Sequence, residues 1–313
     1  MARSFIAVLA IGMIVVSTTY TWPAAAAAAQ SSPAQLPPGQ LSVAEPLRVA
    51  LPRWEFGAGI GAVAFADYRG ADSTHVYALP LPYFIYRGRF LRADRGGLRS
   101  RLFARDDLEL TLSASATTPV RSHNNRARMG MPDLKPTVEL GPAITLRLWR
   151  STDQRRRLEV RGPLRAALSV ESSPRAVGYF FAPTVNFDIS GAAGGLKGWQ
   201  LGALAGPLFA DRRYHDYFYG VAAPYRTATR PTFRARAGYG GTQFTVALSK
   251  HFEHFWLGTF LRYDSLAGAV FDASPLVRTH SYWSTGIGVA WQITESSQRV
   301  SVSDSDAQEG AAR

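Results

Sequence analysis

The chain has 313 residues, a formal charge of +12 and no cysteine. The lack of cysteine excludes a disulfide scaffold and thiol catalysis. Only three of the 35 basic residues are lysines, and the arginines are scattered along the chain without a nucleic-acid-binding motif, so nucleic acid is excluded as an expected partner.

The first 29 residues have the order of a secretory signal peptide. Arg3 precedes an apolar run from Phe5 to Val16, and Pro23 is followed by the small residues of Ala24–Ala29. We expect cleavage near Ala26 to Ala29, and therefore export. The alternative is an uncleaved membrane anchor, but the apolar run is shorter than the roughly 20 residues that a spanning helix needs.

Residues 30–52 contain five prolines together with serine, glutamine and alanine, which predicts an extended periplasmic linker. Residues 53–293 then form one expected domain. Residues 294–313 are polar and are expected to form a disordered tail.

Within residues 53–293, apolar residues alternate with small or polar residues in segments separated by turn signals. In Trp54–Ala66, one face holds Phe56, Ala58 and Ile60, and the other holds glutamate and glycine. The expected strands are Trp54–Ala66, His75–Tyr86, Arg89–Ala93, Leu98–Ala104, Leu108–Pro119, Leu134–Trp149, Arg156–Glu171, Val177–Ile189, Leu196–Ala210, Arg236–Phe252, His254–Leu266 and His280–Ile293.

A sheet with one apolar face and no covering helices predicts a transmembrane antiparallel β-barrel, with lipid outside and polar groups inside. Tight turns and three long loops (Pro119–Asp133, Asp211–Arg234 and Ala267–Thr279) alternate as such a barrel requires if it has about twelve strands. With the N-terminus in the periplasm, five tryptophans lie at the periplasmic ends: Trp54, Trp149, Trp199, Trp256 and Trp291. Ten strands are the alternative count, and a soluble β-sandwich or lipocalin-like barrel is the alternative fold.

Three segments resemble the MipA/OmpV family of outer-membrane proteins, the MltA-interacting proteins. They are Asp67-Tyr-Arg-Gly-Ala-Asp72 with the strand Tyr77-Ala-Leu-Pro-Leu-Pro-Tyr83, the loop Asp211-Arg-Arg-Tyr-His-Asp-Tyr-Phe-Tyr-Gly-Val221, and Ala273-Ser-Pro-Leu-Val277. Ala71 departs from the serine that the family usually has at that position. The signature residues are Asp67, Tyr68, Gly70, Pro80, Pro82, Asp211, Tyr214, Phe218, Gly220, Val221, Ser274 and Pro275.

The resemblance implies a non-enzymatic scaffold in the outer membrane, linking a lytic transglycosylase and a penicillin-binding protein. Adhesion or a stress response is also implied for other members. Outer-membrane lipid and lipopolysaccharide are further expected partners, since arginine pairs well with phosphate. The residues themselves leave a second hypothesis open, an anion-biased channel for small solutes with arginines in its lumen, among them Arg147, Arg161, Arg165, Arg236 and Arg262.

No cofactor, metal or catalytic residue is expected. His251 and His254 flank Glu253 at a tight turn, where their side chains should diverge. Ser122 and His123 are adjacent and cannot form a nucleophile and base relay. The aromatic segment Tyr214–Tyr225 is expected either to plug the barrel mouth or to bind a partner.

Overall fold

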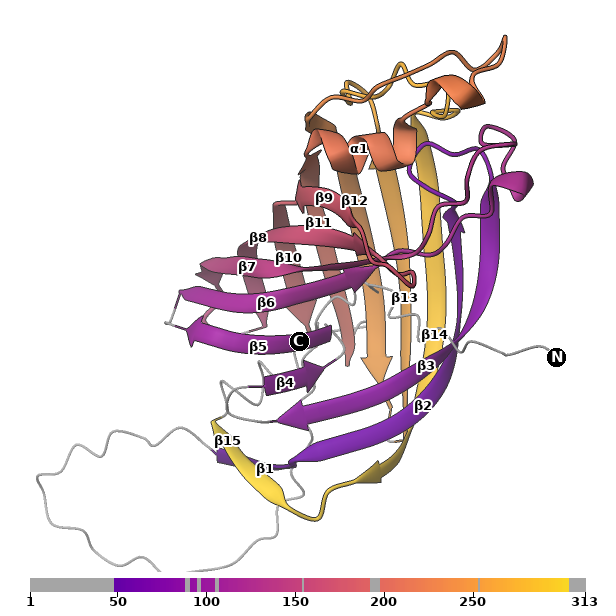
Figure 1. Cartoon of the computed structure of the whole chain (residues 1–313). Coiled ribbons are helices and arrows are strands. Elements are labelled where there is room, and N and C mark those ends of the chain that lie inside the picture. The colour runs from indigo at the N-terminus through magenta and orange to yellow at the C-terminus, as the bar shows by residue number, and fades with distance from the viewer. Residues whose placement is uncertain are drawn as a thin grey trace, which may run out of the picture.

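The computed structural model describes residues 48–87, 91–94, 97–104, 107–153, 155–191, 198–252 and 254–303. The expected signal peptide and most of the linker lie outside these residues. Figure 1 shows a strongly curved sheet with loops and helical turns gathered at one end.

The sheet strands are β2 (Trp54–Ala66), β3 (Thr74–Arg87), β4 (Leu91–Asp94), β5 (Gly97–Ala104), β6 (Leu108–Ala116), β7 (Thr137–Arg150), β8 (Arg156–Ser169), β9 (Ala176–Phe181), β10 (Thr184–Ser190), β11 (Trp199–Ala210), β12 (Gly238–His251), β13 (Phe255–Ser265) and β14 (Ser281–Glu295). The helices are η1 (Ser122–Asn124), α1 (Arg212–Tyr219) and η3 (Ala223–Tyr225). None of the helices in the described part of the chain is long and apolar enough to cross a membrane.

All the sheet pairings are antiparallel, and they close a ring. The order β10-β11-β12-β13-β14-β2-β3-β4-β5-β6-β7-β8-β9 is completed by pairings of β10 with β8 and of β9 with β11. β9 and β10 share one place between β8 and β11, because the expected strand Val177–Ile189 is interrupted at Ala182 and Pro183. The structure therefore confirms an all-β antiparallel barrel, while the strand number stays a prediction because residues 88–90, 95–96 and 105–106 are outside the described set.

The outer surface of the ring is apolar. In β7, Val138, Leu140, Ile144, Leu146 and Leu148 are exposed on one face, and the alternate residues face the lumen. Exposed large apolar side chains recur on β2, β3, β6 and β8 to β14. A soluble barrel would bury these side chains, so the outward apolar surface is that of a lipid-facing wall, as the alternation predicts.

Two glycines lie at sharp corners of the wall. A Cβ atom on Gly141 of β7 would lie 1.9 Å from the carbonyl oxygen of Leu164, and one on Gly206 of β11 would lie 1.9 Å from that of Pro183. The neighbouring backbone occupies the space of a side chain at both positions. Glycine is therefore required there for the sheet to bend.

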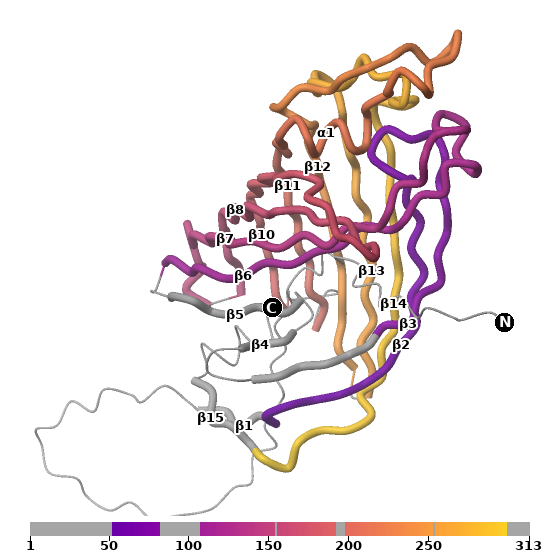
Figure 2. The backbone as a smooth tube through the Cα atoms, in the orientation of Figure 1, coloured from indigo at the N-terminus to yellow at the C-terminus, as the bar shows by residue number. Residues whose placement is uncertain are grey.

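The connections divide as expected between the two ends of the barrel. Long connections follow β6, β11 and β13 at one end, called here the loop end, and Figure 2 shows them gathered there. Short turns join β7 to β8 and β12 to β13 at the other end, called here the turn end.

The five tryptophans lie on the strands toward the turn end, and among the described residues only Trp283 lies at the loop end. Trp256 differs from the others because its side chain is 7% exposed and faces the lumen, over Gly258. It is therefore not part of an aromatic border facing lipid.

The described ends of the linker and tail form a pair of strands that the sequence did not predict. β1 (Arg48–Pro52) pairs with β15 (Arg299–Ser303) in register from Arg48 with Ser303 to Pro52 with Arg299. This ribbon continues the β2–β14 ladder beyond the turn end. The short alternation Arg-Val-Ser-Val-Ser of β15 was the available signal.

Candidate functional site

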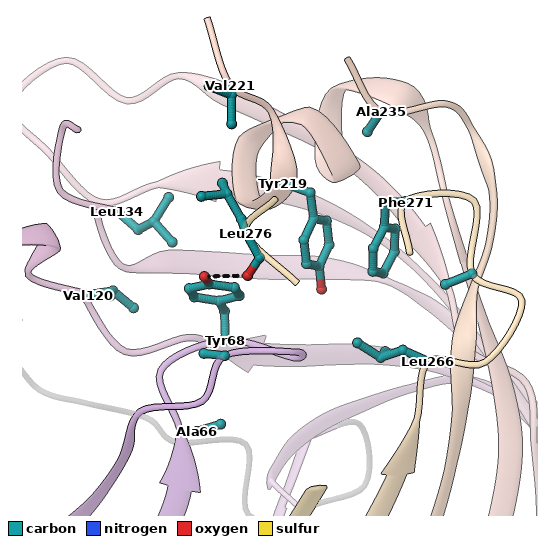
Figure 3. Packing of buried hydrophobic residues seen from close by; sticks show 12 residues of the cluster. Ala66, Tyr68, Val120, Leu134, Tyr219, Val221, Ala235, Leu266, Phe271 and Leu276 are labelled. Carbon is teal, nitrogen blue, oxygen red and sulfur yellow. Dashed lines mark hydrogen bonds between the residues drawn. The ribbon is translucent and has the colours of Figure 1, made fainter. Parts of the chain in front are cut away.

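The three signature segments meet at the loop end. Asp67–Asp72 forms the turn after β2, Asp211–Val221 contains α1, and Ala273–Val277 lies between β13 and β14. Buried residues from these loops and from the β6–β7 loop form one apolar cluster, called here the cap (Figure 3): Ala66, Tyr68, Ala71, Val120, Leu134, Tyr219, Val221, Ala235, Leu266, Ala269, Phe271 and Leu276.

Aromatic rings form the centre of the cap. Tyr219 stacks on Phe271 with ring centroids 3.6 Å apart, and Tyr68 meets Tyr219 edge-on at 6.1 Å. Burial raises the pKa of both phenols, so their hydroxyl groups stay neutral donors.

Each signature segment is hydrogen-bonded to another. The Tyr68 hydroxyl donates to the Leu276 carbonyl at 2.8 Å, as Figure 3 shows. The Ser274 hydroxyl donates to the Tyr219 carbonyl at 2.7 Å, and the Tyr219 hydroxyl donates to the Arg69 carbonyl at 2.9 Å. These contacts join residues far apart in sequence, so the three motifs form one structural unit.

The structure explains why the first motif has a glycine at position 70. The φ of Gly70, 93°, lies in the left-handed region, and its carbonyl oxygen accepts from the amides of Arg278 and Thr279 at 2.7 and 3.2 Å. A Cβ atom there would lie 2.8 Å from the Leu266 side chain. Both the backbone conformation and the space favour glycine.

Two buried arginines that the sequence reading did not select connect loops across the mouth. The Arg128 guanidinium donates to the Phe218 carbonyl at 3.1 Å. Arg230 donates to the carbonyls of Ala127 and Met129 at 3.0 and 2.9 Å, and to that of Tyr225. No local pattern distinguishes these arginines from exposed ones, because their carbonyl partners are set by the tertiary fold.

The cap is also tied to the lumen wall. Arg69 forms an ion pair with Asp264 of β13 at 2.9 Å and donates to the Gly240 carbonyl at 2.8 Å. Asp264 is fully buried and also contacts Arg262. On the other side of the lumen, the Tyr214 hydroxyl donates to Glu139 of β7 at 3.2 Å.

Helix α1 places the aromatic residues of the second motif. Asp211 caps the helix by accepting from the Tyr214 amide at 2.8 Å, and Gly220 ends it with its amide donating to Asp216. Phe218 is half-buried against the cap, and Val221 is buried in it. The aromatic segment thus packs into the barrel mouth, which favours the plug interpretation.

The remaining signature residues have simpler positions. Pro275 is half-buried beside Ser274 in the cap loop. Asp67 accepts from the Asn125 amide group at 2.8 Å. Pro80 and Pro82 lie in β3, paired with Ile60 and Ala58, away from the cap.

The other candidate groups do not converge. Ser122 is buried and donates to the Pro132 carbonyl at 2.7 Å, whereas its neighbour His123 is exposed. Glu253 lies outside the described residues. Across the described part of the chain, no group of three His, Asp or Glu side chains is arranged to hold a metal ion.

His215 gives the cap an expected acid sensitivity. Its Nδ1 atom lies 2.8 Å from the Arg236 carbonyl, and its buried Nε2 atom has no hydrogen-bond partner within the described residues. Burial lowers the pKa of His215 below its usual 6.5. The unfolded loop therefore binds a proton more readily, and cap stability should fall as the pH falls below about 6.5 toward the lower folded value.

The check is protease cleavage of loop 211–237 between pH 7.5 and 5. We expect cleavage to rise on acidification in the native protein, and to rise less in His215→Gln, which cannot titrate. Equal pH profiles for the two proteins would contradict this role of His215.

The family model of MltA-interacting protein MipA matches residues 58–293, which include all three motifs. No curated protein matches the sequence.

Several solved outer-membrane proteins are distantly similar in structure. An outer membrane channel from Pseudomonas putida F1 is 13% identical, covers 78% of this chain and 97% of its own, and has a TM-score of 0.39. A bacterial polysaccharide outer membrane secretin is 10% identical, with 77% and 99% covered and a TM-score of 0.35. A FadL homologue from Pseudomonas aeruginosa is 6% identical, with 77% and 90% covered and a TM-score of 0.31. Structural similarity at these TM-scores gives no information about the function of this chain.

Proposed function

The chain belongs to the family of MltA-interacting protein MipA, and we propose that this outer-membrane barrel is a non-enzymatic scaffold for murein enzymes. In this proposal it holds a lytic transglycosylase and a penicillin-binding protein at the inner side of the outer membrane. The loop end faces outward and the turn end faces the periplasm.

The observation that carries the proposal is the interlocked cap. Loops from β2, β6, β11 and β13 contact one another across the mouth. A barrel with its outer mouth occupied in this way suits a fixed attachment better than transport.

The β1–β15 ribbon is the best-placed element for a periplasmic partner. It extends the wall at the turn end, and neither strand has a second strand neighbour within the described residues. Free strand edges can accept an extended segment of another protein.

The test uses the full chain in detergent micelles, with a purified lytic transglycosylase and a purified penicillin-binding protein as probes. We expect both to be retained by the native protein. Val300→Pro with Val302→Pro, which removes two amide donors from β15, should reduce retention, whereas Arg226→Ala at the loop end should not. Failure of the native protein to retain either enzyme would overturn the scaffold proposal.

The alternative is an anion-biased channel. Two of its expected lumen arginines are offset by acids: Arg147 lies 3.6 Å from Glu159, and Arg262 lies 2.6 Å from Asp264. Arg236, expected in the lumen, is instead exposed in the loop before β12. Planar-bilayer recording separates the two functions, because conductance steps with anion preference would favour the channel.

A further inference from the structure

The long loop between β11 and β12 has an excess of positive charge that its own acids do not offset. Residues 211–237 contain six arginines and two aspartates. Both aspartates are engaged within the loop. Asp211 caps α1, and Asp216 accepts from the Ala235 amide at 2.6 Å and lies 3.5 Å from Arg212.

Four of the six arginines remain available to an external anion. Arg230 is buried and donates to backbone carbonyls, and Arg212 shares Asp216. The other four are exposed, and the described part of the chain offers them no acidic partner within ion-pair distance: Arg213, Arg226, Arg234 and Arg236. An exposed arginine without a partner is well suited to bind phosphate through its forked donors.

Two of these side chains alternate with residues of the cap. Phe233 packs against the cap and Ala235 is buried in it, whereas Arg234 and Arg236 are exposed. Arg234 and Arg236 therefore lie on the side away from the cap. Val221 and Phe233 pair through two backbone hydrogen bonds of 2.9 and 3.1 Å, which hold the segment against the end of α1.

The arginines lie just beyond the apolar wall. Arg236 is two residues before β12, and the rings of Tyr239 and Phe209 lie 5.9 Å apart where β12 and β11 meet. Phe209, Tyr179 and Trp283 are exposed at this end of the wall. Aromatic side chains gather at the boundary of the hydrocarbon layer, so Arg236 lies near the level of lipid head groups, with Arg234 two residues further along the same loop.

We propose that Arg213, Arg234 and Arg236 bind the phosphate groups of a phosphorylated glycolipid in the outer leaflet. Arg213 belongs to α1, and the cap residues Phe233 and Ala235 hold the backbone beside Arg234 and Arg236. Less backbone entropy is therefore lost on binding than in a free loop. The inference rests on the loop end facing outward, as in the scaffold proposal, but not on the murein enzymes.

The test measures binding of bisphosphorylated lipid A to the full chain in detergent micelles. Arg213→Ala with Arg234→Ala and Arg236→Ala should weaken binding at least about tenfold, since charge-assisted contacts are strong. The matched control removes three exposed arginines at the turn end, Arg53→Ala with Arg155→Ala and Arg156→Ala, and should leave binding within about twofold of the native protein.

Further measurements identify the ligand and test the role of the planar guanidinium groups. Lipid A without phosphates should bind as weakly as the loop variant, and inorganic phosphate at millimolar concentration should not compete. Replacing the three loop arginines with lysine should retain part of the affinity, and unheated gel mobility confirms that each variant is folded.

Four results would overturn the proposal: equal loss in both triple variants, tight binding of dephosphorylated lipid, full competition by inorganic phosphate, or binding of heparin without binding of lipid. Retention of murein enzymes is a separate measurement at the other end of the barrel, so the two proposals can fail independently.

Discussion

Replacing Gly141 with alanine is expected to prevent formation of the folded barrel. The added Cβ atom would lie 1.9 Å from the backbone oxygen of Leu164 and 2.8 Å from the Cα atom of Arg165, so the whole strand β8 would have to move. Overlap with backbone cannot be relieved by a side-chain rotation. We therefore expect the free energy of unfolding to fall by about 4 kcal/mol or more. The measurement is the folded fraction after refolding into detergent micelles, read from the mobility of unheated protein on gels.

Gly162→Ala in β8 is the matched control. Its Cβ atom would lie 3.2 Å from the ring of Phe181, an exposed side chain that can shift. Gly162→Ala should therefore refold nearly as well as the native protein. If Gly141→Ala refolds to the same extent as Gly162→Ala, the corner does not depend on glycine.

Replacing Asp264 with asparagine is expected to detach the cap from the lumen wall. Asp264 is fully buried and takes the guanidinium groups of both Arg69 and Arg262, at 2.9 and 2.6 Å. Removing the carboxylate leaves two largely buried cations without their acid, and breaking a buried pair costs about 3–5 kcal/mol. The urea midpoint should fall, and trypsin should gain access to Arg69.

Asp72→Asn supplies the comparison. Asp72 pairs with Arg126 at 3.4 Å, but the Arg126 side chain is 83% exposed. Exposed pairs contribute at most about 1 kcal/mol, so this variant should keep both its urea midpoint and its resistance at Arg69. If the urea midpoint and the trypsin resistance fall equally in the two variants, Asp264 does not hold the cap to the wall.

The strands could be predicted from sequence because their signal is local. Trp54–Ala66 has the bounds expected from its alternation, and several other strands differ by only one to three residues at an end. The apolar face was also correct in β7, since a lipid-facing wall imposes a strict two-residue period.

Helix α1 was not predicted, although its signals are present in retrospect. Asp211 is a favourable capping residue, and the pairs Tyr214 with Phe218 and His215 with Tyr219 have the four-residue spacing of one helix face. An eight-residue helix is marginal alone, and contacts with the cap and with β9 stabilise this one.

The cap itself could be predicted only in part. The family resemblance selected Tyr68, Ser274 and the α1 loop, but nothing local indicated that their hydrogen-bond partners would be one another. The role of Arg69 depends on Asp264, which lies almost 200 residues later in the chain. Such pairings are a property of the closed ring.

The closing pair of strands has a consequence for the order of assembly. Ala64 of β2 pairs with Thr285 of β14, so the ring is joined by residues near opposite ends of the chain, whereas the β12–β13 hairpin needs only a short turn. Loop-closure entropy delays such distant contacts relative to hairpins. The pairing of β2 with β14 should be the last to form. Until then, both strands have an unpaired edge that is exposed to other chains. The β1–β15 ribbon lengthens this final junction by five residue pairs. We therefore expect the ribbon to slow the separation of β2 from β14 once the ring has closed.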